Sequence, residues 1–422
     1  MSIDFTTEQI QLISDACKWF NHNDSEQIFQ YSAPAGAGKS TAMHAIIDAL
    51  GLSQEQVAPM AYTGAATTIM RINGFSNACT IHSWLYMPVE KIEEDPVTKK
   101  LKKSIKYVFR GISKAQYKLI CIDEGSMVPL HMKGDLLRNG IKILVCGDLN
   151  QLPPVKDKPA FLVDGKVRFL TRIMRQSEGS AIVEFSQRIL HNQDLPPGNY
   201  GDLTVIPANI FKQYEQQMIP QMDIVICGLN KTRDFYNSYI RENILKKGNS
   251  PLPTLGEKVI CRKNNWEVEC DGVNLTNGLS GTVMNMPSIH NYHSGSLFTI
   301  DFAPDLFPEI VFKQLDCDFK YFTSSTKMRY AMKEFGNPNY RPEGEKFEFS
   351  YAITTHLSQG SQFYKGIYIQ EYFGGGPEMR KHLNYTGITR FRNKCIYVTP
   401  PIGIYIPIMR SVITINGKSV LE

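Results

Sequence analysis

The segment Ala33–Thr41, with the sequence APAGAGKST, lies between an apolar run at Ile28–Tyr31 and a helix-like segment at Met43–Leu50. Backbone N–H groups of a small-residue loop between a strand and a helix can surround phosphate oxygens, and the helix N-terminus adds to the attraction. The pattern therefore predicts a phosphate-binding loop, the alternative being a plain turn in the core. Lys39 is expected to reach the terminal phosphates of a nucleotide, and Ser40 to bind Mg²⁺. The predicted nucleotide contacts in this loop are Pro34, Ala35, Gly36, Ala37, Gly38, Lys39, Ser40 and Thr41.

Ala33 occupies the position where such loops usually carry their first glycine. Alanine adopts positive φ angles only at a cost in free energy, whereas glycine adopts them freely. We therefore expect the loop entry to use ordinary backbone angles, while Gly36 and Gly38 remain available for the tight part of the loop.

The size and composition of the chain limit its class. A length of 422 residues predicts two to four structural units, and 42% hydrophobic and 21% charged residues are typical of a globular protein. The net charge of +5 permits a polyanionic partner without requiring one. No apolar stretch is long enough to cross a membrane, and the first residues lack the features of a secretory signal. Nine scattered cysteines without a Cys-x-x-Cys pair indicate neither a disulfide framework nor zinc, so a reducing cytoplasm is expected.

Strand-like apolar runs alternate with helical patterns from about residue 28 to 175, which predicts a parallel sheet with helices on both faces. A second set of such runs begins at 223–227 and resumes at 367–369 and 394–398. Between about 255 and 346 the runs are short and separated by Asn, Gly and Pro, which predicts a small all-β insertion in the second unit.

A second, smaller interruption covers residues 86–117. Its first part is acidic, and the stretch from Lys99 to Lys118 carries eight basic residues and no acidic one, with Tyr107 and Phe109 among them. These features favour a projecting hairpin with one basic arm, although a solvated run of surface charge explains the pattern equally well.

Two further apolar runs end in polar residues that suit hydrolysis. Asp123 and Glu124 follow Leu119–Ile122, and after a phosphate-binding loop such a pair is expected to organise Mg²⁺ and to activate the attacking water. Gln151 follows the run at 141–146, and its amide can sense a terminal phosphate by donating or accepting a hydrogen bond. Asp148 in the same stretch is interpreted as a turn residue.

In this order, the three elements resemble superfamily 1 helicases, and the detail is similar to the type B branch that contains RecD and the Dda helicase of T-even phages. The resemblance covers essentially the whole chain. The matching segments are 62–66, 80–83, 123–127, 147–155, 175–176, 230–232, 256–259, 354–361 and 385–390. It departs from the family at Leu357, where a Lys is common, and at Gln362, where an acidic residue is common.

The resemblance implies an α/β fold with two RecA-like motor domains and ATP bound between them. The first domain, 1–175, would carry the hairpin at 86–117 as a strand-separating wedge. The second would comprise 176–254 and 347–422, interrupted by an SH3-like β-barrel at 255–346. The resemblance also implies that Gln9 reads adenine, that Arg175 and Arg390 reach the γ-phosphate, and that Gln359 and Gly360 couple the nucleotide state to the grip on DNA.

DNA contacts are expected on the faces away from the nucleotide. Hydroxyl or backbone donors at Thr63, Gly64, Ser83 and Thr355 would bind phosphates without reading sequence. The rings of His82, Trp84 and His356 would stack on bases, although Trp or His in an α/β domain is more often a core residue. Asn264 and Asn265 belong to a stretch that, by resemblance, helps to guide the strand.

The resulting hypothesis is an ATP- and Mg²⁺-dependent DNA helicase that moves along single-stranded DNA and unwinds duplexes in replication, recombination or repair. Only the resemblance implies 5′→3′ movement. The expected partners are single-stranded DNA, single-strand/duplex junctions, and single-strand-binding or replisome proteins. A monomer in the cytoplasm of a bacterial or phage-infected cell is expected, and the compact chain favours a stand-alone enzyme. The alternatives are a motor subunit of a larger recombination or nuclease complex, an RNA helicase, and a nucleic-acid-stimulated ATPase that remodels protein complexes.

Overall fold

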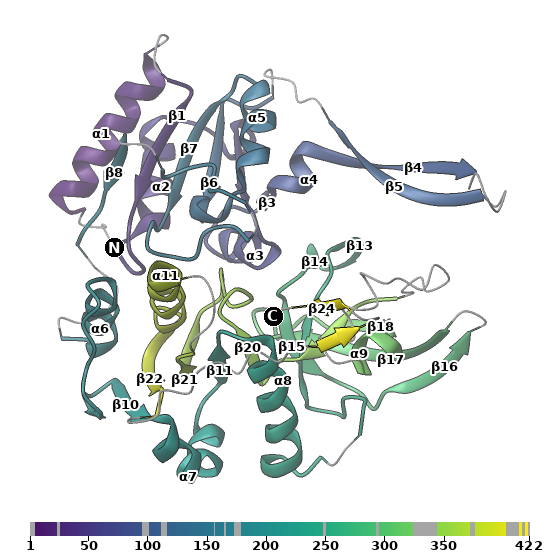
Figure 1. Ribbon diagram of the computed structural model, residues 1–422. Coiled ribbons are helices and arrows are strands. Elements are labelled where there is room, and N and C mark those ends of the chain that lie inside the picture. Colours follow the sequence, from purple (N-terminus) through teal and green to yellow (C-terminus); the bar gives the residue numbers. More distant parts are fainter. Residues whose placement is uncertain are drawn as a thin grey trace.

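The computed structural model describes residues 5–22, 26–94, 101–110, 116–155, 157–163, 166–172, 179–247, 250–292, 295–323, 344–371, 376–401, 413–415 and 418–420. They form two α/β domains, one above the other in Figure 1, with an antiparallel β-domain beside the second. The prediction of two parallel-sheet units is confirmed.

The first domain contains a six-stranded, all-parallel sheet in the order β3-β2-β6-β7-β1-β8. Successive residues of β6 point to opposite faces of this sheet. Leu119 and Cys121 pack with α1 and α2, whereas Ile120 and Ile122 pack with α4 and α5. The strands are β1 (Ile28–Ser32), β2 (Val57–Ala61), β3 (Cys79–Thr80), β6 (Leu119–Asp123), β7 (Lys142–Gly147) and β8 (Val167–Phe169). The helices are α1 (Thr7–Asn21), α2 (Lys39–Ala49), η1 (Gln54–Gln56), α3 (Gly64–Ile72), α4 (Ile81–Leu85), η2 (Gly125–Met127) and α5 (Leu130–Arg138).

A long two-stranded hairpin leaves the first domain after α4. Its strands, β4 (Tyr86–Glu94) and β5 (Leu101–Phe109), pair in one antiparallel register from Tyr86 opposite Phe109 to Glu94 opposite Leu101. Figure 1 shows it projecting away from the sheet, above the β-domain. The acidic and the basic arm of the sequence thus lie side by side, although Lys99 and Lys100 fall outside the described residues.

The second domain has a six-stranded sheet in the order β20-β11-β21-β22-β10-β9, parallel except for the edge strand β9. Helices α6 and α11 pack on one face, and α7 and α8 on the other. The strands are β9 (Gly198–Asn199), β10 (Leu203–Pro207), β11 (Ile224–Cys227), β20 (Ala352–Thr354), β21 (Phe363–Ile369) and β22 (Phe391–Thr399). The helices are α6 (Ala181–Leu190), α7 (Ala208–Met218), η3 (Ile219–Gln221), α8 (Asn230–Tyr239), the π-helical η4 (Ile240–Ile244) and α11 (Gly376–Ile388).

The β-domain interrupts the second domain between η4 and β20. Its main sheet runs β16-β17-β15-β12-β19, with β18 also paired to β17, and all pairings are antiparallel. Its likeness to an SH3-like barrel stays a prediction. Its elements are β12 (Lys258–Cys261), β13 (Asn265–Cys270), β14 (Val273–Leu275), β15 (Ser280–Val283), β16 (Ser288–Tyr292), β17 (Gly295–Pro304), β18 (Phe312–Asp318), α9 (Phe319–Thr323) and β19 (Phe347–Phe349); a separate pair, β23 (Ile413–Ile415) and β24 (Lys418–Val420), follows near the C-terminus.

Among the described residues, no helix is both long and apolar enough to cross a membrane.

Candidate nucleotide site between the motor domains

The loop at residues 33–41, here called the P-loop, runs from the end of β1 into α2. Gly36 and Gly38 have positive φ angles of 86° and 79°, and a Cβ atom on Gly38 would lie 2.7 Å from Nε2 of Gln9. Both positions therefore require glycine. Ala33 has no positive φ angle, and its N–H donates to the carbonyl of Gly147 over 2.9 Å. The alanine at the loop entry consequently introduces no backbone strain.

Gln9 lies in the first turn of α1, where it is half of a capping box, and its side chain lies near the P-loop. Its side-chain oxygen accepts from the N–H of Thr6 over 2.9 Å, and the hydroxyl of Thr6 accepts from the N–H of Gln9. This arrangement fixes the amide beside Gly38. Its reading of adenine stays a prediction.

Lys39, Asp123 and Glu124 come together where the P-loop meets the carboxyl end of β6. Nζ of Lys39 lies 3.7 Å from Oε2 of Glu124, and the N–H of Glu124 donates to Oδ1 of Asp123 over 2.7 Å. Glu124 has a φ angle of 52°, an uncommon conformation for a residue with a side chain. Such strained positions concentrate at functional sites.

Burial and mutual charge shape the ionisation of this group. Desolvation would lower the pKa of Lys39, but the negative fields of Glu124, Asp123 and Asp148 outweigh it and raise the pKa above its usual range. Lys39 therefore stays a cation at neutral pH. Desolvation, followed by repulsion from Glu124, raises the pKa of Asp123, whereas Lys39 opposes the rise.

The loop after β7 adds two side chains to this site. Asp148 is fully buried, and its carboxylate accepts hydrogen bonds from the N–H of Asn150 (3.0 Å), Nε2 of Gln151 (3.4 Å) and the hydroxyl of Tyr385 (2.8 Å). Oε1 of Gln151 is buried without a hydrogen-bond partner among the described residues. The sequence favours a turn residue at Asp148, whereas the structure shows that this side chain contacts the second domain. The missed signal was a carboxylate directly after a strand of the phosphate-binding sheet.

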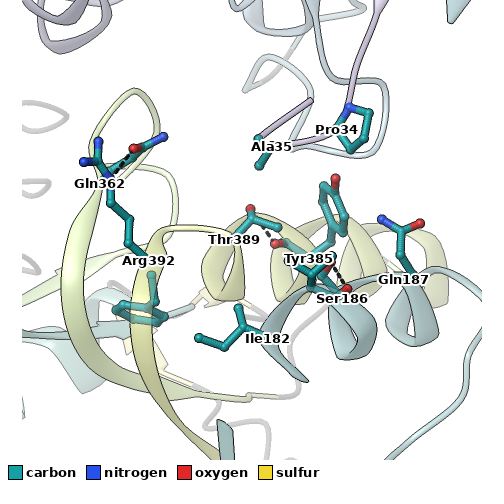
Figure 2. A pocket seen from close by; sticks show the side chains of 12 residues that line it. Pro34, Ala35, Ile182, Ser186, Gln187, Gln362, Tyr385, Thr389 and Arg392 are labelled. Carbon is teal, nitrogen blue, oxygen red and sulfur yellow. Dashed lines mark hydrogen bonds between the residues drawn. The ribbon is translucent and has the colours of Figure 1, made fainter. Parts of the chain in front are cut away.

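The second domain faces the P-loop across a pocket of about 480 Å³. Figure 2 shows Pro34 and Ala35 opposite Tyr385 and Thr389, with Gln362 and Arg392 at one side. The other residues that line the pocket are Gly36, Ile182, Val183, Ser186, Gln187 and Phe391.

Gln359 and Gly360 lie where the second domain touches the first. Nε2 of Gln359 donates to the carbonyl of Leu152 over 3.2 Å. Gly360 has a φ angle of 81°, and a Cβ atom there would lie 3.0 Å from the backbone N of Ala66. Both residues of the predicted coupling motif thus contact the first domain directly.

Of the two arginines predicted to reach the γ-phosphate, the structure describes Arg390. Arg390 is only 3% exposed, and its guanidinium donates to the carbonyls of Thr386 (3.1 Å) and Ser361 (3.4 Å). To bind a phosphate as predicted, the guanidinium of Arg390 would have to leave these two carbonyls. Arg175 lies outside the described residues. Arg392 lines the pocket, where its Nε donates to Gln362 over 2.6 Å.

The residues predicted to contact phosphates of DNA are mostly engaged within the protein. The hydroxyl of Thr63 caps α3, and Gly64 is buried so closely that an added Cβ atom would lie 2.5 Å from Cβ of Thr276. The hydroxyl of Thr355, which is fully buried, donates to the carbonyl of Cys227 over 3.1 Å, and that of Ser83 donates to the carbonyl of Thr80. Their contacts with DNA stay predictions.

The predicted base-stacking rings lie in different surroundings. Trp84 is buried in the core between the first sheet and α5, which agrees with the core alternative. The ring of His82 packs against Tyr107 of the hairpin at a centroid distance of 4.6 Å. Burial lowers the pKa of both His82 and His356, so each is neutral at pH 7.

Two asparagines of the β-domain complete the predicted DNA contacts. Oδ1 of Asn264 accepts from the N–H of Asn277 over 2.7 Å. Nδ2 of Asn265 donates to Oε1 of Glu345 over 2.6 Å. Both amides therefore stabilise the β-domain itself.

A metal ion at this site would depend on the nucleotide. The described residues contain no group of three His, Cys, Asp or Glu side chains that could hold a metal by themselves. Ser40 at the start of α2 and Asp123 at the end of β6 fit Mg²⁺, because this ion usually keeps several waters and binds one or two protein oxygens besides phosphates.

Comparison with known proteins finds matches to part of the chain. A family model described as an AAA domain matches residues 6–196. The ATP-dependent DNA helicase PIF1 of Candida albicans is 32% identical over 173 residues, covering 38% of this chain and 18% of that protein. Pif1 of a Psychrobacter species is 31% identical over 172 residues, covering 34% and 24%. The matches span less than a quarter of these relatives.

Solved structures extend the likeness to nearly the whole chain. A Bacteroides Pif1 helicase in complex with ADP-AlF3 and single-stranded DNA has a TM-score of 0.54 at 18% identity, covering 94% of this chain and 92% of that one. Pif1 from Candida albicans has a TM-score of 0.53 at 15% identity, covering 94% of each chain. The sequence matches show that part of the chain is similar to DNA helicases named Pif1, and the solved structures show that nearly the whole chain shares their fold.

Proposed function

We propose that the chain is an ATP-dependent DNA helicase that moves 5′→3′ along single-stranded DNA and unwinds duplexes. One observation carries the proposal: the P-loop, which brings Lys39 to Asp123 and Glu124, also forms one wall of a pocket whose opposite wall belongs to the second domain. A nucleotide in this pocket would touch both domains, so its hydrolysis would change how they are held together. The relatives named as DNA helicases support this function.

Each residue has a defined part in hydrolysis. The P-loop amides and Lys39 bind the phosphates of ATP. Ser40 and Asp123 would hold Mg²⁺, and the bound ion would neutralise phosphate charge. Glu124 orients and deprotonates the attacking water, and Gln151 hydrogen-bonds the terminal phosphate through its amide. Arg175 and Arg390 stabilise the charge on that phosphate as the cleft closes.

Movement along DNA follows from alternating contacts of the two domains with the strand. The first domain contributes the surface around Thr63 and His82, the second the surface around His356, and the β-domain guides the strand near Asn264. Backbone contacts of this kind bind any sequence, which suits a motor that acts on many substrates. We further propose a monomer that works in the cytoplasm with single-strand-binding or replisome proteins in replication, recombination or repair.

An unwinding assay on duplexes with a 5′ or a 3′ single-stranded tail tests activity and direction together. We expect ATP-dependent separation of the 5′-tailed duplex and none of the 3′-tailed one. DNA-stimulated ATP hydrolysis without strand separation would favour an ATPase that remodels protein complexes or a subunit of a larger motor. Stronger stimulation by RNA than by DNA would point to an RNA helicase.

The hairpin of β4 and β5 is proposed to separate the strands. Replacement of residues 90–106 by a short turn should leave DNA-stimulated ATP hydrolysis within about twofold of the wild type, because the site described above contains no residue of this segment. Unwinding of the tailed duplex should fall at least about tenfold, because the wedge is lost. Parallel ATPase and unwinding measurements check both effects, and an equal fall in the two activities would show that the hairpin holds DNA or supports the fold.

A further inference from the structure

The loop after β7 is held by the second domain at four points. Two of them fix Leu152: its N–H donates to the hydroxyl of Thr386 over 2.9 Å, and its carbonyl accepts from Gln359 over 3.2 Å. The carbonyl of Asn150 lies 2.9 Å from Nδ1 of His382, and the carboxylate of Asp148 accepts from the hydroxyl of Tyr385 over 2.8 Å. Three of the four partners belong to one helix, α11.

Tyr385 differs from the other three because its bond ends on a charged group. Asp148 is fully buried, as is the ring of Tyr385, and the same carboxylate lies 3.4 Å from Nε2 of Gln151. Hydrogen bonds to buried charged groups are stronger than those between neutral groups, and an unmade one is costly. Tyr385 also lines the pocket opposite Pro34 and Ala35 (Figure 2). One side chain of the second domain therefore faces the P-loop across the pocket and binds the acidic anchor of the Gln151 loop.

We propose that Tyr385 is a positioning residue for hydrolysis: its hydroxyl holds Asp148, and Asp148 holds the loop that presents Gln151 to the terminal phosphate. The inference rests on the proposed function, since it assigns a role in the same ATP site. When α11 separates from the first domain, the bond between Tyr385 and Asp148 breaks and the loop loses its anchor. Hydrolysis is thereby restricted to the docked arrangement of the two domains.

Tyr385→Phe removes the hydroxyl and keeps the ring, so it tests the proposal directly. We expect kcat of DNA-stimulated ATP hydrolysis to fall by about tenfold, with KM for ATP and affinity for single-stranded DNA within about twofold of the wild type. The matched control is Tyr368→Phe, because the hydroxyl of Tyr368 is also buried but donates within the second domain, to Asn384 over 2.9 Å. The control should keep kcat within about twofold.

A double-mutant cycle separates positioning from a general loss of packing. If Tyr385 acts through Asp148, Tyr385→Phe should lower kcat no further in an Asp148→Asn background than Asp148→Asn does alone. Multiplied losses, or a Tyr385→Phe variant as active as the Tyr368→Phe control, would overturn the proposal.

Thermal unfolding reports whether each variant is folded. If Tyr385→Phe is not, Thr386→Val, which removes the bond to Leu152, must lower kcat in the same way. A wild-type protein without DNA-stimulated ATPase refutes the proposed function instead.

Discussion

Replacement of Lys39 by alanine should reduce DNA-stimulated ATP hydrolysis by about 10³-fold or more. Lys39 lies in the negative fields of Glu124, Asp123 and Asp148, and these fields keep it protonated at neutral pH. In the proposed complex with ATP the same charge would face the phosphates, where negative charge develops during transfer. Alanine offers neither a positive charge nor a hydrogen-bond donor. Helix α2 contains no second lysine that could replace Lys39. Steady-state ATPase measurements with saturating single-stranded DNA check the effect.

Lys166→Ala is the matched control for this variant. Lys166 also pairs with a glutamate, Glu26, but its side chain is 71% exposed and lies outside the pocket. Exposed ion pairs contribute little to stability, so this variant should hydrolyse ATP at the wild-type rate. Circular dichroism should show that both variants are folded. ATP hydrolysis by a folded Lys39→Ala protein at the wild-type rate would refute the assignment of the P-loop.

The parallel sheets were predictable because their signal is local. Strands buried on both faces read as continuous apolar runs, and β6 and β7 lie within one residue of the runs at 119–122 and 141–146. The P-loop was equally local, since Gly36 and Gly38 adopt the positive φ angles that the sequence pattern requires. Ala33 could be tolerated because its position does not need such an angle.

Contacts between the domains were not predictable, because their partners lie far apart in the sequence. Asp148 reads as a turn residue until Tyr385 is placed 2.8 Å away. Gly64 reads as a donor for DNA phosphates, whereas the structure packs it against Thr276 of the β-domain. Local patterns reveal which residues suit a chemical role, but only the arrangement of domains reveals which of them are buried against one another.

The β-domain is attached to the second motor domain by a buried ion pair, and breaking it should strongly destabilise the protein. Glu257 is fully buried, and its carboxylate accepts from Nε and Nη2 of Arg241 over 2.7 and 3.2 Å. Arg241 belongs to η4, and its guanidinium stacks on Phe349 of β19 at 3.9 Å. The pair therefore joins elements of both domains. Glu257→Gln would leave the buried guanidinium without its counter-charge, and we expect a loss of about 3–5 kcal/mol in the free energy of unfolding.

Urea unfolding measures the loss of stability in Glu257→Gln and in Glu184→Gln. Comparing the two losses shows whether the stability comes from the burial of the ion pair or from the pairing itself. Glu184 pairs with Arg188 over 2.7 Å, the same residue types at the same distance, but on the exposed surface of α6. Water already solvates both of these charges, so the loss there should be about 0.3–0.5 kcal/mol. The two pairs differ mainly in desolvation and in the additional bonds to Glu257 from Thr254 and Tyr351. Equal losses in the two variants would mean that water reaches Glu257, and the β-domain would then be held to the motor domain by apolar packing alone.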